Sequence, residues 1–393
     1  MSLRTDHRTA ILTGMTPDAG VIGELLSYDR DGFGDELPRR RVPMADEPFV
    51  DTWRTYAHDV SEHGIGCLAD RLVQLQFPVA DGISETDAYR AATRRGDHAG
   101  TAARLTLNLC QPEACSILIH WTWAGSIPVI QTGCREDFVS LLRAFTMRNE
   151  PRPVPESMGA CIVGGYNNWD RFEQAKQRWM LEHPGQAFTF GCVADATEEY
   201  RDRLILLSPG WYSHVPPERL GLSESTWRDL SLAIRREHES THYCTRRLFS
   251  VMRNSLLDEI IADACGIVAA LGAFRADWLL AFLGLDQFPL CRAGGRIHNY
   301  RGTPPLSDAA FSVLQRMVVS AATNLERFTR AHRGDMEGPL GILLLLVTLS
   351  RMSVETLSSE DAGVLLDDSL ELSRRWARGA GALGPLHSRV YGD

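Results

Sequence analysis

Residues 235–243 of the chain read RREHESTHY and contain the pattern His-Glu-x-x-His. On a helix, His238 and His242 project from the same face one turn apart, so both can reach a single metal ion. Glu239 lies between them and can act as a base on water held by that metal. The stretch therefore predicts a helix that carries two metal ligands and a catalytic carboxylate.

A second helix is predicted directly downstream. Residues 254–263 read NSLLDEIIAD, in which Ser255 opens a Ser-x-x-Asp capping pattern, and the helix is expected to run to about Leu271. Glu259 and Asp263 are one turn apart on one face of it. If the chain turns back between the two helices, they pair antiparallel and Glu259 comes level with the histidines. Neither Gly nor Pro marks that turn, so the capping pattern is its one signal.

These residues resemble the gluzincin metallopeptidases, the thermolysin-like clan, which carry His-Glu-x-x-His on one helix and Glu-x-x-x-Asp on the next. The resemblance implies a site for one Zn²⁺ with three ligands: His238, His242 and Glu259. It also implies that Glu239 is the general base and that Asp263 orients a ligand histidine from the second shell. The resemblance covers about residues 223–272. The Gly-x-Met-Glu-Asn motif of the related aminopeptidases is absent, so the resemblance implies the site and leaves the substrate class open.

The chemistry of the residues agrees with this interpretation. Two imidazoles and one carboxylate leave an open zinc position for water. Glu259 and Asp263 lie among apolar residues, and carboxylates in such surroundings need a partner. The structural alternative is that arginines of the neighbouring helix pair with them, namely Arg246, Arg247 or Arg253. A di-iron bundle, which Glu239-x-x-His242 would also suit, needs a second Glu-x-x-His, and the sequence contains none.

Further candidate residues follow the two helices. Residues 294–305 read GGRIHNYRGTPP, an irregular segment dense in polar and aromatic side chains. A hydrolytic site needs a group outside the metal shell to stabilise the oxyanion, and His298 and Tyr300 are the candidate catalytic groups here. The possible substrate-binding residues are Arg296, Arg301 and Tyr243. The alternative is that the loop residues lie at the surface and that Tyr243 packs in the core.

Composition narrows the class of protein. A chain of 393 residues is expected to form two domains, and a net charge of −9 argues against nucleic-acid binding. Nine scattered cysteines without a CxxC pair predict a reducing, cytoplasmic location. No secretory leader and no apolar run long enough to span a bilayer is present, so no membrane partner is expected. Oligomeric state is not indicated.

The pattern predicts an α+β protein, with a mixed N-terminal half that holds a small β-sheet and a mainly helical, zincin-like second half. The expected divisions are an irregular arm at 1–45, a mixed α/β region at 46–195 and the helical metal-site domain at 196–393. Alternating or β-branched runs predict strands at 104–110, 115–123, 127–131, 160–163, 187–193 and 203–207. The last of these could serve as an edge strand for extended substrate.

The function expected from these features is a zinc-dependent hydrolase that cleaves a peptide or an amide-containing small molecule. One alternative is a metal-dependent enzyme of another reaction class, which modifies a small molecule or peptide in a biosynthetic pathway. Another is a non-catalytic binding protein with a structural metal. Glu239 counts against the latter, because a structural site needs no base beside the metal.

Overall fold

The computed structural model describes residues 3–28, 33, 37–97, 104–193, 196–250 and 255–382. It is an α+β protein, as predicted, with many helices and one four-stranded mixed sheet. The chain divides into two compact units. The helical unit comprises Met1–Met44 and Tyr212–Asp393, and the sheet unit comprises Ala45–Trp211. Among the described residues, no helix is both long enough and apolar enough to cross a membrane.

The sheet unit is built on four strands in the order β1-β2-β4-β3. β1 and β2 form an antiparallel hairpin, β2 and β4 are parallel, and β4 pairs antiparallel with β3. The strands are β1 (Ser116–His120), β2 (Ile127–Gln131), β3 (Ala160–Asn167) and β4 (Arg201–Leu207). The helices of this unit are α3 (Phe49–His63), α4 (Asp87–Arg95), α5 (Arg135–Thr146) and α6 (Trp169–Glu182).

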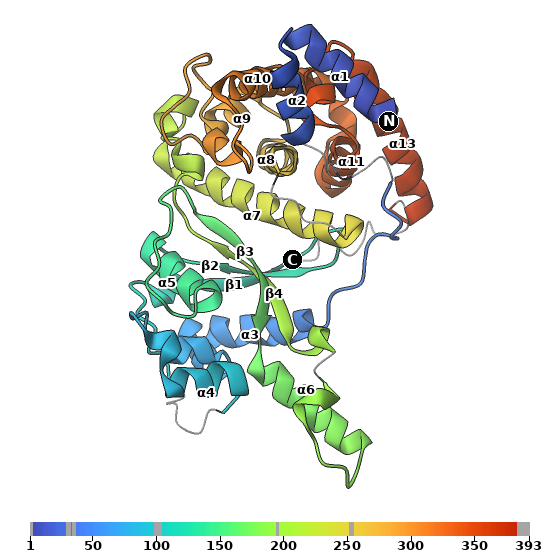
Figure 1. Cartoon of the computed structure of the whole chain (residues 1–393). Coiled ribbons are helices and arrows are strands. Elements are labelled where there is room, and N and C mark those ends of the chain that lie inside the picture. The colour runs from blue at the N-terminus through green and yellow to red at the C-terminus, as the bar shows by residue number, and fades with distance from the viewer. Residues whose placement is uncertain are drawn as a thin grey trace. The chain divides into compact units, whose positions relative to one another are not determined.

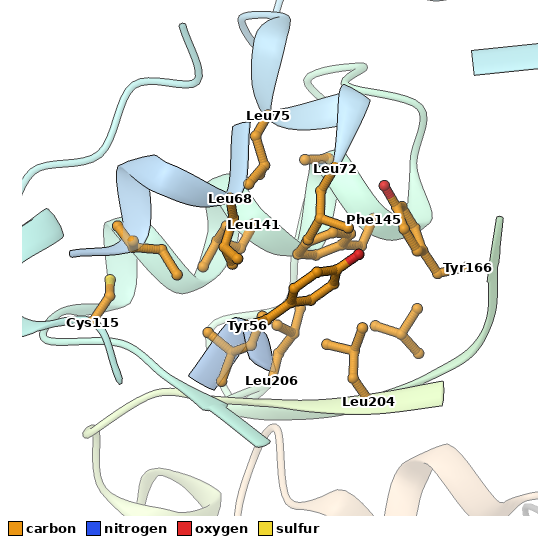
Figure 2. Close-up of a cluster of buried hydrophobic side chains, with 14 of the residues drawn as sticks. Tyr56, Leu68, Leu72, Leu75, Cys115, Leu141, Phe145, Tyr166, Leu204 and Leu206 are labelled. Carbon is orange, nitrogen blue, oxygen red and sulfur yellow. The ribbon is translucent and has the colours of Figure 1, made fainter. Parts of the chain in front are cut away.

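The core of the sheet unit lies between its helices and the sheet. Figure 2 shows Tyr56 of α3, Leu141 and Phe145 of α5, and Leu204 and Leu206 of β4 within one cluster of buried side chains. Burial of such apolar surface contributes about 25 cal/mol per Å² to stability, so this cluster is the main source of cohesion in the unit.

A buried polar network lies beside this core. Asp202 of β4 is fully buried and accepts hydrogen bonds from Trp53 Nε1 at 2.8 Å and Asn168 Nδ2 at 2.7 Å. It also pairs with the guanidinium of Arg171 on α6 at 2.5 Å. Asn168 caps α6, because its side chain accepts from the backbone of Asp170 and Arg171. One carboxylate therefore ties α3, α6 and β4 together.

Replacing Asp202 by Ala should destabilise the protein by about 3–5 kcal/mol, because the change leaves the buried Arg171 charge without its partner. Urea unfolding followed by circular dichroism measures the effect. Glu173→Ala is the matched control, since Glu173 forms an exposed ion pair with Lys176 on α6, and such a pair contributes about 0–1 kcal/mol. Equal losses in the two variants would contradict the structural role of Asp202.

The helical unit surrounds one apolar helix. α8 (Leu256–Leu271) buries 12 of its 16 residues and packs against α7, α9 and α11 (Figure 1). Carboxylates at Asp258 and Asp263 are therefore exceptional within it. The other helices of this unit are α1 (Leu3–Met15), α2 (Ala19–Tyr28), α7 (Glu224–Phe249), α9 (Ala276–Leu283), α10 (Asp308–Ala331), α11 (Gly338–Ser350), α12 (Val354–Ser358) and α13 (Ala362–Ala380).

α7 and α8 pack closely against each other. A Cβ atom at Gly266 of α8 would lie 2.9 Å from the backbone oxygen of Ile234 on α7, so only glycine permits this approach. One turn further along α7, His238 contacts Asp263, and another turn on, His242 contacts Asp258. Residue numbers therefore rise along α7 where they fall along α8, so the two helices pair antiparallel, as predicted.

The facing ends of α7 and α8 have defined cap conformations. Ser250 ends α7 with φ +58°, a left-handed conformation that glycine adopts more readily. Ser255 caps α8, because its hydroxyl accepts from the backbone N–H of Asp258 at 3.3 Å. The predicted turn itself falls on residues 251–254, outside the described residues. The cap expected from the Ser-x-x-Asp pattern is therefore confirmed on the serine side.

The structure corrects the prediction for residues 1–45. This segment was expected to be irregular, but it contains α1 and α2, which pack in the helical unit. Arg8 forms a buried ion pair with Glu355 of α12 at 2.6 Å, and Glu24 accepts from the backbone N–H of Ser307 at 2.8 Å. The boundary between the units also lies after Trp211 instead of near 195, because β4 belongs to the sheet.

Three strand predictions also need correction. Residues 104–110 form no strand, and 187–193 contain only the 3₁₀ turn Phe190–Cys192. The strand that includes residues 203–207, β4, lies between β2 and β3, so it is an interior strand and offers no free edge to a substrate. β3 is longer than expected and runs through Gly164 and Gly165, where its pairing with β4 shifts register.

Candidate metal site

Three candidate ligand atoms converge between α7 and α8, within the helical unit. His238 Nε2 lies 3.1 Å from His242 Nε2 and 3.5 Å from Glu259 Oε2. His242 Nε2 lies 3.6 Å from Glu259 Oε1. Zinc bonds of about 2.0–2.1 Å in a tetrahedral site place ligand atoms about 3.3–3.4 Å apart. The three side chains therefore form a group with the dimensions of a metal site.

The outer nitrogen of His238 is held by two side chains. Its Nδ1 lies 2.9 Å from Asp263 Oδ1 and 2.9 Å from the hydroxyl of Tyr212. The Tyr212 hydroxyl also donates to Asp263 Oδ1 at 2.6 Å. A carboxylate on Nδ1 fixes the ring and leaves the Nε2 lone pair directed inward, as a metal ligand requires.

Tyr212 reaches this position from a strained turn. It begins the 3₁₀ turn Tyr212–His214, in which Ser213 and His214 have φ of +51° and +56°. Positive φ at residues other than glycine costs free energy and persists only where surrounding contacts enforce it. Here the Tyr212 ring packs against Phe282 of α9, with ring centroids 4.7 Å apart. The strain accompanies the placement of the hydroxyl at His238.

His242 has a matching partner in Asp258. Asp258 is fully buried, and its Oδ2 lies 3.2 Å from His242 Nδ1. Neither carboxylate oxygen has another hydrogen-bond partner among the described residues. A buried carboxylate is costly without compensation, so the contact with His242 is the one that accounts for it. Each histidine thus has its own outer carboxylate.

Arg296 closes the cluster from the 3₁₀ helix Arg296–Tyr300. Its Nη2 donates to Glu259 Oε2 at 2.5 Å, and its Nη1 lies 3.2 Å from Asp263 Oδ2. The same Nη1 donates to the hydroxyls of Tyr212 at 3.2 Å and Ser213 at 3.0 Å. An arginine of this segment therefore neutralises the two carboxylates; of the arginines predicted for this role, Arg253 lies outside the described residues.

The electrostatics keep the two α8 carboxylates ionised. Burial opposes the ionisation of Glu259, but the charges of His238, Arg296 and His242 outweigh it and lower the pKa of this carboxyl. Burial of Asp263 is likewise outweighed by the Arg296 charge and by the hydrogen bond from His238, so its pKa is about 2. Ionised carboxylates are the form that binds a metal or holds a ligand imidazole.

The same cluster favours positive charge on the imidazole of His242. Burial would lower the pKa of His242, but Asp258, through its hydrogen bond and charge, then Glu259 and Glu239 raise it to about 9. These three carboxylates and Asp263 lie around the two imidazoles and Arg296, and the buried guanidinium of Arg235 lies over the Tyr212 ring beside them. The ionised carboxylates would also attract a divalent cation.

Two predicted catalytic residues lie beside the ligands. Glu239 is half-buried next to His238 on α7, and its charge acts on His242. The Tyr300 hydroxyl hydrogen-bonds to Glu259; burial first and then the Glu259 charge raise the pKa of this phenol, so it keeps its proton. Its backbone oxygen accepts from the Tyr28 hydroxyl at 2.6 Å, which ties it to α2.

Of the remaining predicted residues, His298, Arg301 and Tyr243 have their contacts outside the cluster. His298 is exposed, with its Nε2 3.3 Å from Cys291 Sγ, because alternate residues of the 3₁₀ helix face different directions. Arg301 donates to Leu306 O and Asp308 at 2.8 and 2.7 Å. Tyr243 is fully buried and accepts from Arg247 Nη1 at 3.3 Å. Arg296, predicted to bind substrate, has its guanidinium engaged by the ligand carboxylates.

Sequence reasoning missed two residues of the cluster. Asp258 carried a signal, since it precedes Glu259 directly, but the capping pattern already accounted for it. Its side chain instead faces His242, and only its backbone takes part in the cap. Tyr212 carried no signal, because it follows a Ser-Pro-Gly turn and belongs to no periodic pattern.

Comparison with known proteins places the chain in a family. No curated protein matches it at a significant level, and no solved structure does. Residues 10–361 match the model of a protein family, and this span includes every residue of the candidate metal site. Because the match covers most of the chain, the protein belongs to DUF7005, a family of unknown function.

Proposed function

We propose that the protein is a zinc-dependent hydrolase that cleaves a peptide or amide bond at the cluster of His238, His242 and Glu259. The observation that carries the proposal is the set of three distances, 3.1, 3.5 and 3.6 Å, between ligand atoms whose outer sides are held by carboxylates or by Arg296. The ligand set is that of the gluzincins, which the sequence pattern resembles.

The residues around the cluster suit this chemistry. A bound Zn²⁺ would lower the pKa of water towards 7 and polarise the substrate carbonyl. Glu239, which follows His238 on α7, would accept the proton of that water and pass it to the leaving nitrogen. Tyr300, whose hydroxyl keeps its proton, can donate to the carbonyl oxygen as negative charge develops there. A structural metal would need neither group, which favours a catalytic role.

The proposal is tested by metal analysis combined with a substrate screen. We expect the purified protein to hold one zinc ion per chain and to cleave members of a peptide and N-acyl amide library. Removing the metal with a chelator should abolish cleavage, and added Zn²⁺ should restore it. Protein that takes up no zinc when dialysed against it would exclude the proposal. Iron or manganese in its place would favour an enzyme of another reaction class.

Asp258→Asn should weaken zinc binding by about 10–100-fold, because outer partners of ligand histidines contribute that much to metal affinity. Competition with a fluorescent zinc chelator measures the change. Asp277→Asn is a suitable control, since this acid lies in the first turn of α9 and pairs with the exposed Arg275. Unchanged affinity in Asp258→Asn would remove this carboxylate from the site.

A further inference from the structure

We propose that Arg296 is a positioning residue that reserves one oxygen of Glu259, so that this carboxylate offers a metal only its other oxygen. The inference rests on the proposed metal site and deepens it, because it assigns the number of protein ligand atoms. Its basis is the bond of 2.5 Å between Arg296 Nη2 and Glu259 Oε2.

The two oxygens of Glu259 lie at similar distances from the two imidazoles. Oε2 lies 3.5 Å from His238 Nε2, and Oε1 lies 3.6 Å from His242 Nε2. Both could therefore bind the same ion, which would fill a second coordination position. Arg296 distinguishes the two carboxylate oxygens, because it donates a hydrogen bond to Oε2. With Oε2 occupied, two imidazoles and one oxygen remain, and a four-coordinate metal keeps a position for water.

Arg296 is itself fixed by three further partners. Its Nη1 contacts Asp263 Oδ2 and donates to Tyr212 and Ser213, from the turn before α7. The planar fork thus links Glu259 to the groups that orient His238. Lysine, a point charge with no fork, cannot make both sets of contacts.

Two opposing effects of Arg296 can be separated. Its positive charge repels a cation, whereas its fork holds the ligand carboxylate in place. If charge dominates, Arg296→Lys should resemble the wild type and Arg296→Met should bind metal more tightly. If the fork dominates, Arg296→Lys should weaken metal binding and change the coordination although it keeps the positive charge, and Arg296→Met should weaken binding as well. The bond of 2.5 Å to Glu259, together with the contacts of 3.0–3.3 Å to Tyr212, Ser213 and Asp263, favours the second outcome.

The experiment uses Co²⁺ in place of zinc in the full-length protein. Four-coordinate Co²⁺ absorbs visible light much more strongly than five- or six-coordinate Co²⁺, so its spectrum reports the number of ligands. We expect a strong band in the wild type, a weaker band in Arg296→Lys and metal affinity lowered by about 10-fold or more. Arg301→Lys is the matched control, because Arg301 follows the same 3₁₀ helix and bonds Leu306 and Asp308 instead.

The outcomes distinguish this inference from the proposed function. A wild type that binds no Co²⁺ or Zn²⁺ excludes the metal site, and the inference with it. A wild type that binds metal, with an unchanged spectrum and affinity in Arg296→Lys, overturns the role of Arg296 alone. A loss of thermal stability without a spectral change would also overturn it, because Arg296 would then act only in the fold. If Arg296→Met does not fold, the lysine variant decides.

Discussion

Glu239→Gln should retain one zinc ion per chain and lose hydrolytic rate by about 10²–10⁴-fold, the contribution typical of a general base. Glutamine has the size of glutamate but cannot accept the proton of water at neutral pH. The carboxylate is not among the three converging ligand atoms, so metal content should not change. Rates on any substrate found in the library, together with metal analysis of the same sample, measure the two effects.

The matched control for this change is Glu237→Gln. Glu237 lies two residues earlier on α7, and its carboxylate contacts Arg236 at 3.3 Å. It has the same charge and helix but sits outside the ligand group, so its removal should leave the rate within about twofold. A Glu239→Gln variant as active as this control would eliminate Glu239 as the base. A variant that lost its zinc would instead assign Glu239 to metal binding.

The convergence of His238, His242 and Glu259 could be predicted because it follows from the helical period. His238 and His242 share a face by spacing alone, as do Glu259 and Asp263, and one antiparallel turn brings the pairs together. The capping signal at Ser255 set the register of α8, and the structure has that cap. The contacts that these side chains receive from residues outside α7 and α8 could not be predicted from the sequence. Tyr212 and Arg296 reach the cluster from short 3₁₀ segments, whose conformation no repeat in the sequence encodes.

The errors in the fold have physical causes of the same kind. Residues 104–110 alternate as a strand would, but the backbone N–H groups of Cys110 and Gln111 donate to Asp137 at 2.5 and 2.9 Å, and no strand pairs with them. α1 has few apolar residues, but it packs in the helical unit, where Arg8 forms an ion pair with Glu355, far away in sequence. Both segments make long-range polar contacts, which local patterns in the sequence do not report.

Glu259→Ala should abolish stoichiometric zinc binding, because two imidazoles alone hold a metal weakly. It should also lower stability by about 3–5 kcal/mol, since Arg296 is left buried without its nearest carboxylate. A purely structural ion pair would produce the second effect without the first. Metal analysis and urea unfolding must therefore be measured together.

The dependence of stability on zinc separates the two explanations. A ligand at 100 times its dissociation constant stabilises the folded state by about 2.7 kcal/mol, so added Zn²⁺ should raise the unfolding midpoint of the wild type. Glu259→Ala should show no such rise. His298→Ala is the histidine control, because that ring is exposed beside Cys291, and it should respond to zinc as the wild type does. If Glu259→Ala also kept the zinc response, the carboxylate would serve the fold through Arg296 and the ion would be held elsewhere.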